Sequence, residues 1–396
     1  MIKFKDFKFS AIFLSFTILI ILFLHFGGWK LYPVYGSFLF QDWMYIYDYW
    51  ACLERPDKTP ESIKEFCHSV KNANFVYPRR WQVFALNIEN RELFKNLIFI
   101  FIITYIWICT NILKKYNLKY LIFFLFSPVS ILILQRGNID LIIIFLTYLF
   151  YVQFKNKKFF YTLIPYSLSI LLKIYTVALL PLYYFFKEHN KNMFMFFLIC
   201  LSLILLFIID LDLLLSNYNK AGLTLAFNSA VLFKIFNQLT NYNLNYQFIS
   251  IFFILILFLI SLFNKVKLPK IDKKYEISFL IGSSIIVSSF FLNEGFVYKL
   301  IFLIFVLPLI IEYKRKISTT NFLFLISSIF LSLWIEYLTF IYEIIFDLNL
   351  DELKQKKIIN LKNFFYGVIV MLKNFFYWNL NILLIFISTK ILIRQN

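Results

Sequence analysis

Charged residues are scarce in this chain, at 16% of its 396 residues, while 61% are hydrophobic and 53 are phenylalanine. A soluble domain of this length needs far more charge to cover the apolar surface that this composition produces. Several stretches lack any charge and approach the length of a helix that crosses about 30 Å of hydrocarbon; 9–26 and 193–209 are two of them. The composition therefore excludes an ordinary soluble protein and predicts an all-α polytopic membrane protein.

Histidine and cleavage signals are also lacking. The three histidines stand far apart, at His25, His68 and His189, and match no metal-ligand spacing, so we expect no metal site and no cofactor. The first apolar run follows Lys3, Lys5 and Lys8, is too long for a signal peptide and precedes no small-residue cleavage site. It is interpreted as the first membrane span. No internal repeat is visible.

What the chain does have is a net charge of +18, which by itself suggests a nucleic-acid partner. The positions of the basic residues argue against one, because they gather in short loops between apolar segments: 114–119, 155–158, 187–191, 265–274 and 314–316. Such clusters mark the cytoplasmic side of a membrane protein, beside anionic lipid. The pattern predicts membrane lipid as a partner and no nucleic acid.

With this orientation the chain forms one integral membrane domain, 1–396, with about twelve spans and both termini in the cytoplasm. The third and fourth spans form a hairpin that turns at 135–140, and later hairpins turn near 173 and at 293–299. Two large loops face the extracytoplasmic side, a long first loop at 29–93 and a second loop at 210–247. A small amphipathic segment, 347–363, lies on the same side. We expect this topology in a bacterial inner (plasma) membrane.

Three of the extracytoplasmic turns carry a cation, namely Arg136, Lys173 and Lys299. The helices beside them are shorter than the roughly twenty residues that a span needs, so the turns are expected to lie below the outer surface. Cations at such depth either bind an anionic ligand, here a lipid phosphate, or form internal ion pairs that fix helix packing. Asp140 and Glu294 are possible local partners for Arg136 and Lys299.

The first loop supplies carboxylates, Asp42 and Asp48, within an aromatic segment that follows the first span. A carboxylate shielded from water by aromatic rings can serve as a general base. The alternative for either residue is a solvated or helix-capping aspartate. The aromatic rings themselves are suited either to stack on a sugar or to form an interfacial belt.

The order of these motifs resembles the GT-C class of integral membrane glycosyltransferases, and most closely glycosyltransferase family 87, a mannosyltransferase-like group that uses polyprenyl-phosphate sugars. The resemblance spans roughly 29–308. It rests on Asp42 with Tyr45 and Tyr47, Phe75-Val76-Tyr77-Pro78, Ser127-Pro128-Val129, Gln135-Arg136-Gly137-Asn138-Ile139-Asp140-Leu141, Leu172-Lys173-Ile174-Tyr175, Asn228-Ser229 and Asn237-Gln238. The chain departs from the family in having Thr176 where many members have proline, and no histidine in the turn at 293–299.

The resemblance implies an inverting hexosyltransferase of the cell envelope, acting on the extracytoplasmic face. It would move a mannose-like hexose from a polyprenyl-phosphate donor to a lipid-linked or cell-surface glycan acceptor. Asp42 would be the general base, with Asp48 in reserve. Substrate and phosphate would be bound by Arg136, Asn138, Lys173, Lys299, Tyr45, Tyr77 and Arg79. The alternatives are a lipid-linked sugar transporter or flippase, and a glycan ligase or polymerase.

Two pairings are further expectations. Cys52 and Cys67 both lie in the first loop, where they either form a disulfide or remain free thiols. Glu336 and Lys373 fall at similar depths in the last two spans, and we expect them to form an ion pair.

Overall fold

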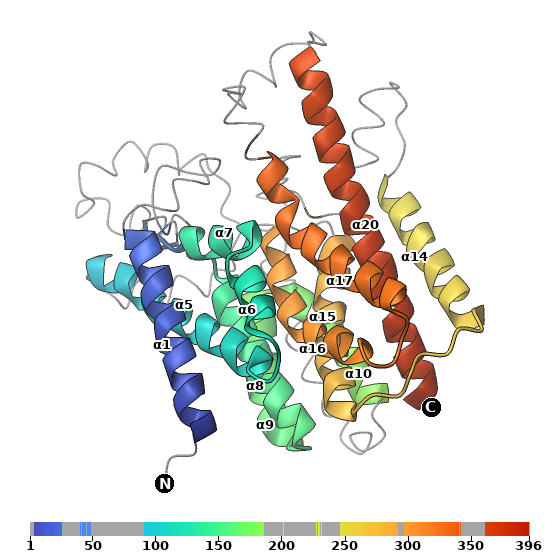
Figure 1. Cartoon of the computed structure of the whole chain (residues 1–396), viewed down its shortest axis with the longest axis horizontal. Coiled ribbons are helices and arrows are strands. Elements are labelled where there is room, and N and C mark those ends of the chain that lie inside the picture. Colours follow the sequence, from blue (N-terminus) through green and yellow to red (C-terminus); the bar gives the residue numbers. More distant parts are fainter. Residues whose placement is uncertain are drawn as a thin grey trace.

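The computed structural model describes residues 4–25, 40, 42–44, 46–48, 91–185, 201, 227, 229, 231, 246–291, 297–339, 341 and 361–395. Every regular element in these ranges is a helix (Figure 1). The elements are α1 (Phe4–His25), α5 (Arg91–Leu113), α6 (Leu118–Leu125), α7 (Pro128–Arg136), α8 (Asp140–Lys155), α9 (Phe159–Leu172), the 3₁₀ helix η4 (Ile174–Leu179), α10 (Leu180–Phe185), α14 (Tyr246–Phe263), α15 (Lys273–Phe291), the 3₁₀ helix η6 (Val297–Phe302), α16 (Leu303–Tyr313), α17 (Thr319–Trp334) and α20 (Leu361–Gln395).

Several of these helices are long and apolar enough to cross a membrane. Three pass on length and composition, Glu92–Leu113, Thr319–Thr339 and Gly367–Arg394, and the bent pair α6 and α7 adds a fourth if it is one span. Shorter apolar helices cover Ser10–Leu24, Tyr161–Leu172 and Phe252–Phe263. The described residues therefore indicate an integral membrane protein with three or four spans by this measure. The expected count of about twelve stays a prediction.

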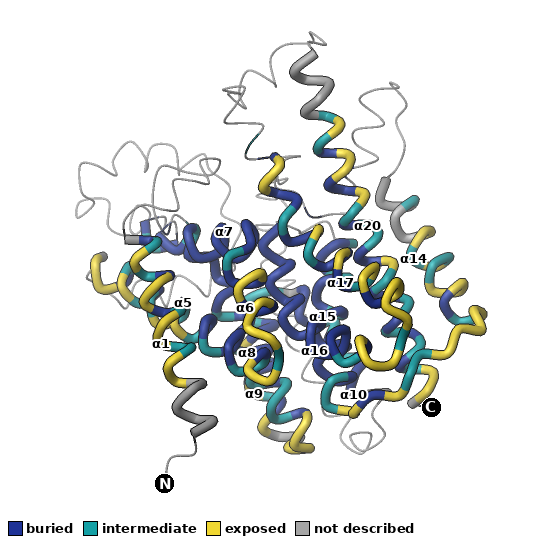
Figure 2. Tube along the Cα trace, in the orientation of Figure 1, coloured by how far each residue is buried: buried dark blue, intermediate teal, exposed yellow. Residues whose placement is uncertain are grey.

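Large apolar side chains cover the outside of the helix assembly, as expected of a surface that faces lipid. On α14, Phe252 and Leu255 are each 55% exposed and Phe263 is 81% exposed. Figure 2 shows similar exposed stretches along α1, α5, α6 and α17, surrounding a buried centre. A soluble monomer rarely exposes so much contiguous apolar surface, which supports the membrane assignment.

The first helix begins, and the last helix ends, on the same side of the molecule. The beginning of α1, the turn between α8 and α9, and the end of α20 lie on the lower side of Figure 1. The turn that joins α7 to α8 lies nearer the upper side. This arrangement separates the lysine-rich turn at 155–158 from the turn that carries Arg136.

The expected third span is not one continuous helix. It is divided into α6 and α7, which are bent by 52° relative to each other. Pro128 occupies the first turn of α7 and has no N–H to continue the helix, while the Ser127 hydroxyl accepts a hydrogen bond from the Ser130 N–H at 3.3 Å and caps the new helix. The Ser127-Pro128 pair thus directs α7 away from α6, and it places Arg136 in the last turn of α7.

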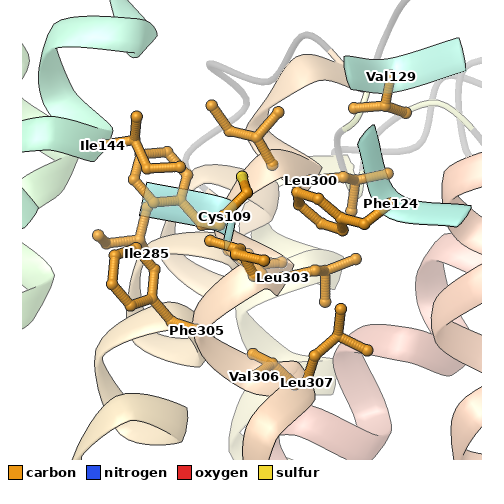
Figure 3. Close-up of a cluster of buried hydrophobic side chains, with 14 of the residues drawn as sticks. Cys109, Phe124, Val129, Ile144, Ile285, Leu300, Leu303, Phe305, Val306 and Leu307 are labelled. Atoms are coloured by element: carbon orange, nitrogen blue, oxygen red, sulfur yellow. The ribbon is translucent and has the colours of Figure 1, made fainter. Parts of the chain in front are cut away.

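The core is centred on η6 and α16, which pack against α5, α7, α8, α15 and α17; Figure 3 shows part of it. Gly282 on α15 permits this packing, because a Cβ atom there would lie 2.8 Å from the Phe302 carbonyl oxygen. The close approach fixes η6, which carries Lys299, against the hairpin partner α15.

Candidate functional site

The segment around Asp42 is fixed by contacts on both sides of it. The Phe40 N–H donates a hydrogen bond to the Gln135 carbonyl at 2.6 Å, which ties the segment to α7. The Trp43 indole N–H donates to the Phe94 carbonyl at 2.7 Å, and its ring stacks on the Phe94 ring at 4.7 Å between centroids. Asp42 is therefore held between α5 and the end of α7.

The turn beneath Asp42 requires glycine. Gly137 ends α7 with a φ of +59°, in the left-handed region that favours glycine. A Cβ atom at Gly137 would lie 3.1 Å from the Trp43 Cβ and 3.2 Å from the Phe40 Cβ. The absence of a side chain lets the Asp42 segment rest directly on the turn that carries Arg136 and Asn138.

Both carboxylate oxygens of Asp42 have partners from this turn. The Arg136 Nε and Nη2 atoms lie 2.8 and 2.5 Å from Oδ1, and the Asn138 Nδ2 donates to Oδ2 at 2.6 Å. The side chains of Asp42 and Arg136 are 11% and 19% exposed. The result is a charge-assisted contact that remains partly accessible from outside the protein.

A second carboxylate, Asp140, begins α8 two residues after Asn138. Its Oδ2 lies 2.7 Å from the Lys299 Nζ, and its Oδ1 accepts a hydrogen bond from the Tyr175 hydroxyl at 2.6 Å. The Lys299 Nζ also lies 3.8 Å from the centre of the Tyr175 ring. Lys173 is near enough for its charge to act on Asp140. The Asp140 side chain is fully buried and that of Lys299 is 2% exposed.

The turn at 135–140 therefore brings together most of the expected site that the structure describes. Asp42 contacts Arg136 and Asn138, while Asp140 contacts Lys299 and lies within range of the Lys173 charge. Each of Arg136 and Lys299 finds its carboxylate far away in sequence, whereas local pairing of Arg136 with Asp140 had been one expectation. Asp48, the reserve base, is buried at 8% exposure.

Other expected features lie outside the described residues. They are Tyr45, Tyr77, Arg79, Glu294, Cys52, Cys67, most of the loops at 29–93 and 210–247, and the segment 347–360. Within the described ranges, no group of three histidine, cysteine, aspartate or glutamate side chains is arranged to hold a metal ion. The Tyr175 hydroxyl was not expected to take part in the site; its position two residues after Lys173, where α9 gives way to η4, was the available signal.

A separate ion pair joins the apolar stretch Thr319–Thr339, which continues past the end of α17, to α20. The Lys373 Nζ lies 3.1 Å from the Glu336 Oε1, and both side chains are fully buried. The Tyr377 hydroxyl donates to the same oxygen at 2.5 Å. The expected pairing of Glu336 with Lys373 is confirmed. The cluster uses its charges internally, so it is interpreted as a packing contact between two apolar helices.

The chain matches no protein-family model, and the comparisons with curated proteins and with solved structures return no match either.

Proposed function

We propose that the protein is a membrane hexosyltransferase that moves a mannose-like sugar from a polyprenyl-phosphate donor to a lipid-linked or cell-surface glycan acceptor. The observation that carries the proposal is the direct contact of Asp42 with Arg136 and Asn138. It places a carboxylate, which can accept a proton, beside a guanidinium, which suits a phosphate. An inverting transfer from a sugar phosphate needs both groups within one site.

The reaction is a single displacement. The acceptor hydroxyl attacks the anomeric carbon, and its proton passes to the Asp42 carboxylate as the new carbon–oxygen bond forms. The bond between that carbon and the phosphate oxygen breaks, and the electron pair leaves with polyprenyl phosphate. Asn138 holds one oxygen of Asp42, which fixes the direction in which the carboxylate faces the acceptor.

Positive charge near the turn assists the leaving group. A guanidinium carries five N–H donors in a planar fork, so Arg136 is able to hold Asp42 and contact a phosphate oxygen together. Lys173 and Lys299 add positive charge close by. Fixed cations stabilise the charge that develops on the phosphate, which is work that a metal ion does in other transferases.

The site is proposed to lie on the extracytoplasmic face of a bacterial plasma membrane. The distribution of basic loops supports this location, and with it about twelve spans and both termini in the cytoplasm. The beginning of α1 and the end of α20 both lie on the lower side of Figure 1, away from the turn between α7 and α8, which supports this orientation.

A lipid-linked sugar transporter is the second candidate. The bent pair α6 and α7 favours it, because transporters build binding sites at the ends of interrupted helices. Such a protein would move the donor across the bilayer without breaking the sugar–phosphate bond.

The two functions differ in their products. Purified protein in detergent, given a short-chain polyprenyl-phosphate hexose and a lipid-glycan extract, is expected to release polyprenyl phosphate and to label the extract with sugar. The same donor is then offered to liposomes that contain the protein, with an enzyme that detects the donor enclosed inside. Movement into the liposomes without release in detergent would support the transporter and contradict the transferase.

A further inference from the structure

The two carboxylate–cation contacts at the turn differ in accessibility, although both join a turn residue to a distant segment. The Asp42–Arg136 contact has side chains that are 11% and 19% exposed, while those of Asp140 and Lys299 are 0% and 2% exposed. An entering phosphate can reach Arg136 from outside. It can reach Lys299 only if the buried pair separates, which would leave the Asp140 charge without its ion partner in a low-dielectric interior.

Both carboxylate oxygens of Asp140 have a partner, since one binds Lys299 and the other accepts a hydrogen bond from Tyr175. The Lys299 ammonium lies against the Tyr175 ring, so these three side chains all contact one another. Their backbones belong to α8, η4 and η6, three elements that are separated in sequence and are brought together by folding. A closed cluster of this kind holds elements in place and does not take up a substrate proton.

Two hydrogen bonds, both made by the Asn138 side chain, connect this cluster to Asp42. The Asp140 backbone N–H donates to the Asn138 Oδ1 at 3.0 Å, so the Asn138 amide presents its oxygen to α8 and its nitrogen to Asp42. The placement of Asp140 thereby sets the orientation of Asn138, and Asn138 sets the orientation of the Asp42 carboxylate.

We propose that Asp140, with Lys299 and Tyr175, is a positioning unit that fixes the α7–α8 turn beneath Asp42, while Arg136 alone of the two ion-paired cations contacts the donor phosphate. This inference rests on the proposed transferase function. It changes the role of Lys299 from a phosphate ligand to an internal support.

The test is a double-mutant cycle with Asp140→Asn, Lys299→Met and the combined variant. Asp140→Asn and Lys299→Met are each expected to lower kcat on the order of a hundredfold, because the base is displaced from its geometry. The KM for the polyprenyl-phosphate donor should stay close to that of the wild type. The combined variant should have a kcat no lower than either single variant, since both changes disable the same unit.

The melting temperature of each variant in detergent serves as the folding control. The combined variant contains no buried charge at this pair, so it should melt at a higher temperature than Asp140→Asn, in which Lys299 stays charged and loses the Asp140 carboxylate. When the combined variant is folded, a lowered kcat reflects lost positioning of Asp42 and not unfolding.

Two results would overturn the inference, and they differ from failure of the proposed function. A raised donor KM in Lys299→Met, with kcat retained in Asp140→Asn, would make Lys299 a direct phosphate ligand. Losses in kcat that multiply in the combined variant would show that the two residues act independently. Absence of transfer by the wild type with every donor would overturn the transferase itself, and this inference with it.

Discussion

Replacing Asp42 with asparagine is expected to lower the rate of sugar transfer by about a hundredfold to ten-thousandfold, the range found when a general base is removed. Asparagine has nearly the shape of aspartate but cannot accept the proton of the acceptor hydroxyl. The change also leaves Arg136 without the carboxylate at 2.5 Å. The measurement is the initial rate of polyprenyl-phosphate release at saturating donor.

Asp48→Asn is the matched control, because it makes the same chemical change six positions along at another buried aspartate. It should keep a rate within a few-fold of the wild type. If Asp48→Asn loses transfer while Asp42→Asn retains it, Asp48 is the base and the role given to Asp42 is wrong.

The second large effect is on stability. Lys373→Met is expected to lower the free energy of unfolding by about 3–5 kcal/mol, the cost of leaving one member of a buried ion pair without its partner. Glu336 would keep its hydrogen bond from the Tyr377 hydroxyl but would lose the Lys373 ammonium, which lies 3.1 Å away in the wild type. Unfolding in mixed detergent, followed by circular dichroism, measures the change.

Two variants make this result interpretable. Glu336→Gln combined with Lys373→Met removes both charges and should recover much of the loss. Lys274→Met disrupts the Lys274–Asp272 pair, whose side chains are 35% and 53% exposed, and should cost no more than about 1 kcal/mol. Equal losses for Lys373→Met and Lys274→Met would contradict the buried pairing.

The sequence was sufficient for the class of fold because composition and the lengths of apolar runs decide it. The α5 helix ends at Leu113, as expected from the basic cluster that follows it. The separation of α6 from α7 was not predicted, although Ser127-Pro128 is a recognisable start of a helix. Mean hydropathy over this segment does not reveal the break, because the helices on both sides of it are apolar.

The two ion-paired cations of the candidate site stood out in the sequence, but the carboxylates that they contact were not predicted. Arg136 and Lys299 stood out as cations within apolar surroundings. The carboxylate partner of each cation depends on how the turn at 135–140 packs against other segments, and Lys299 is 159 positions from Asp140. A local sequence pattern does not predict a contact between residues so far apart. Glu336 and Lys373 were paired correctly because their depths in two expected spans already matched.

The donor phosphate is proposed to bind at the turn that carries Arg136. The most direct test of this binding site is the affinity of a short-chain polyprenyl phosphate for the wild type, Arg136→Gln and Lys119→Gln, measured by calorimetry in detergent. Arg136→Gln should weaken binding by roughly ten- to a hundredfold, the loss of a charge-assisted hydrogen bond. Lys119→Gln, which changes an exposed lysine at the start of α6, should leave binding unchanged. Equal weakening in both variants, or unchanged affinity in Arg136→Gln, would contradict the account.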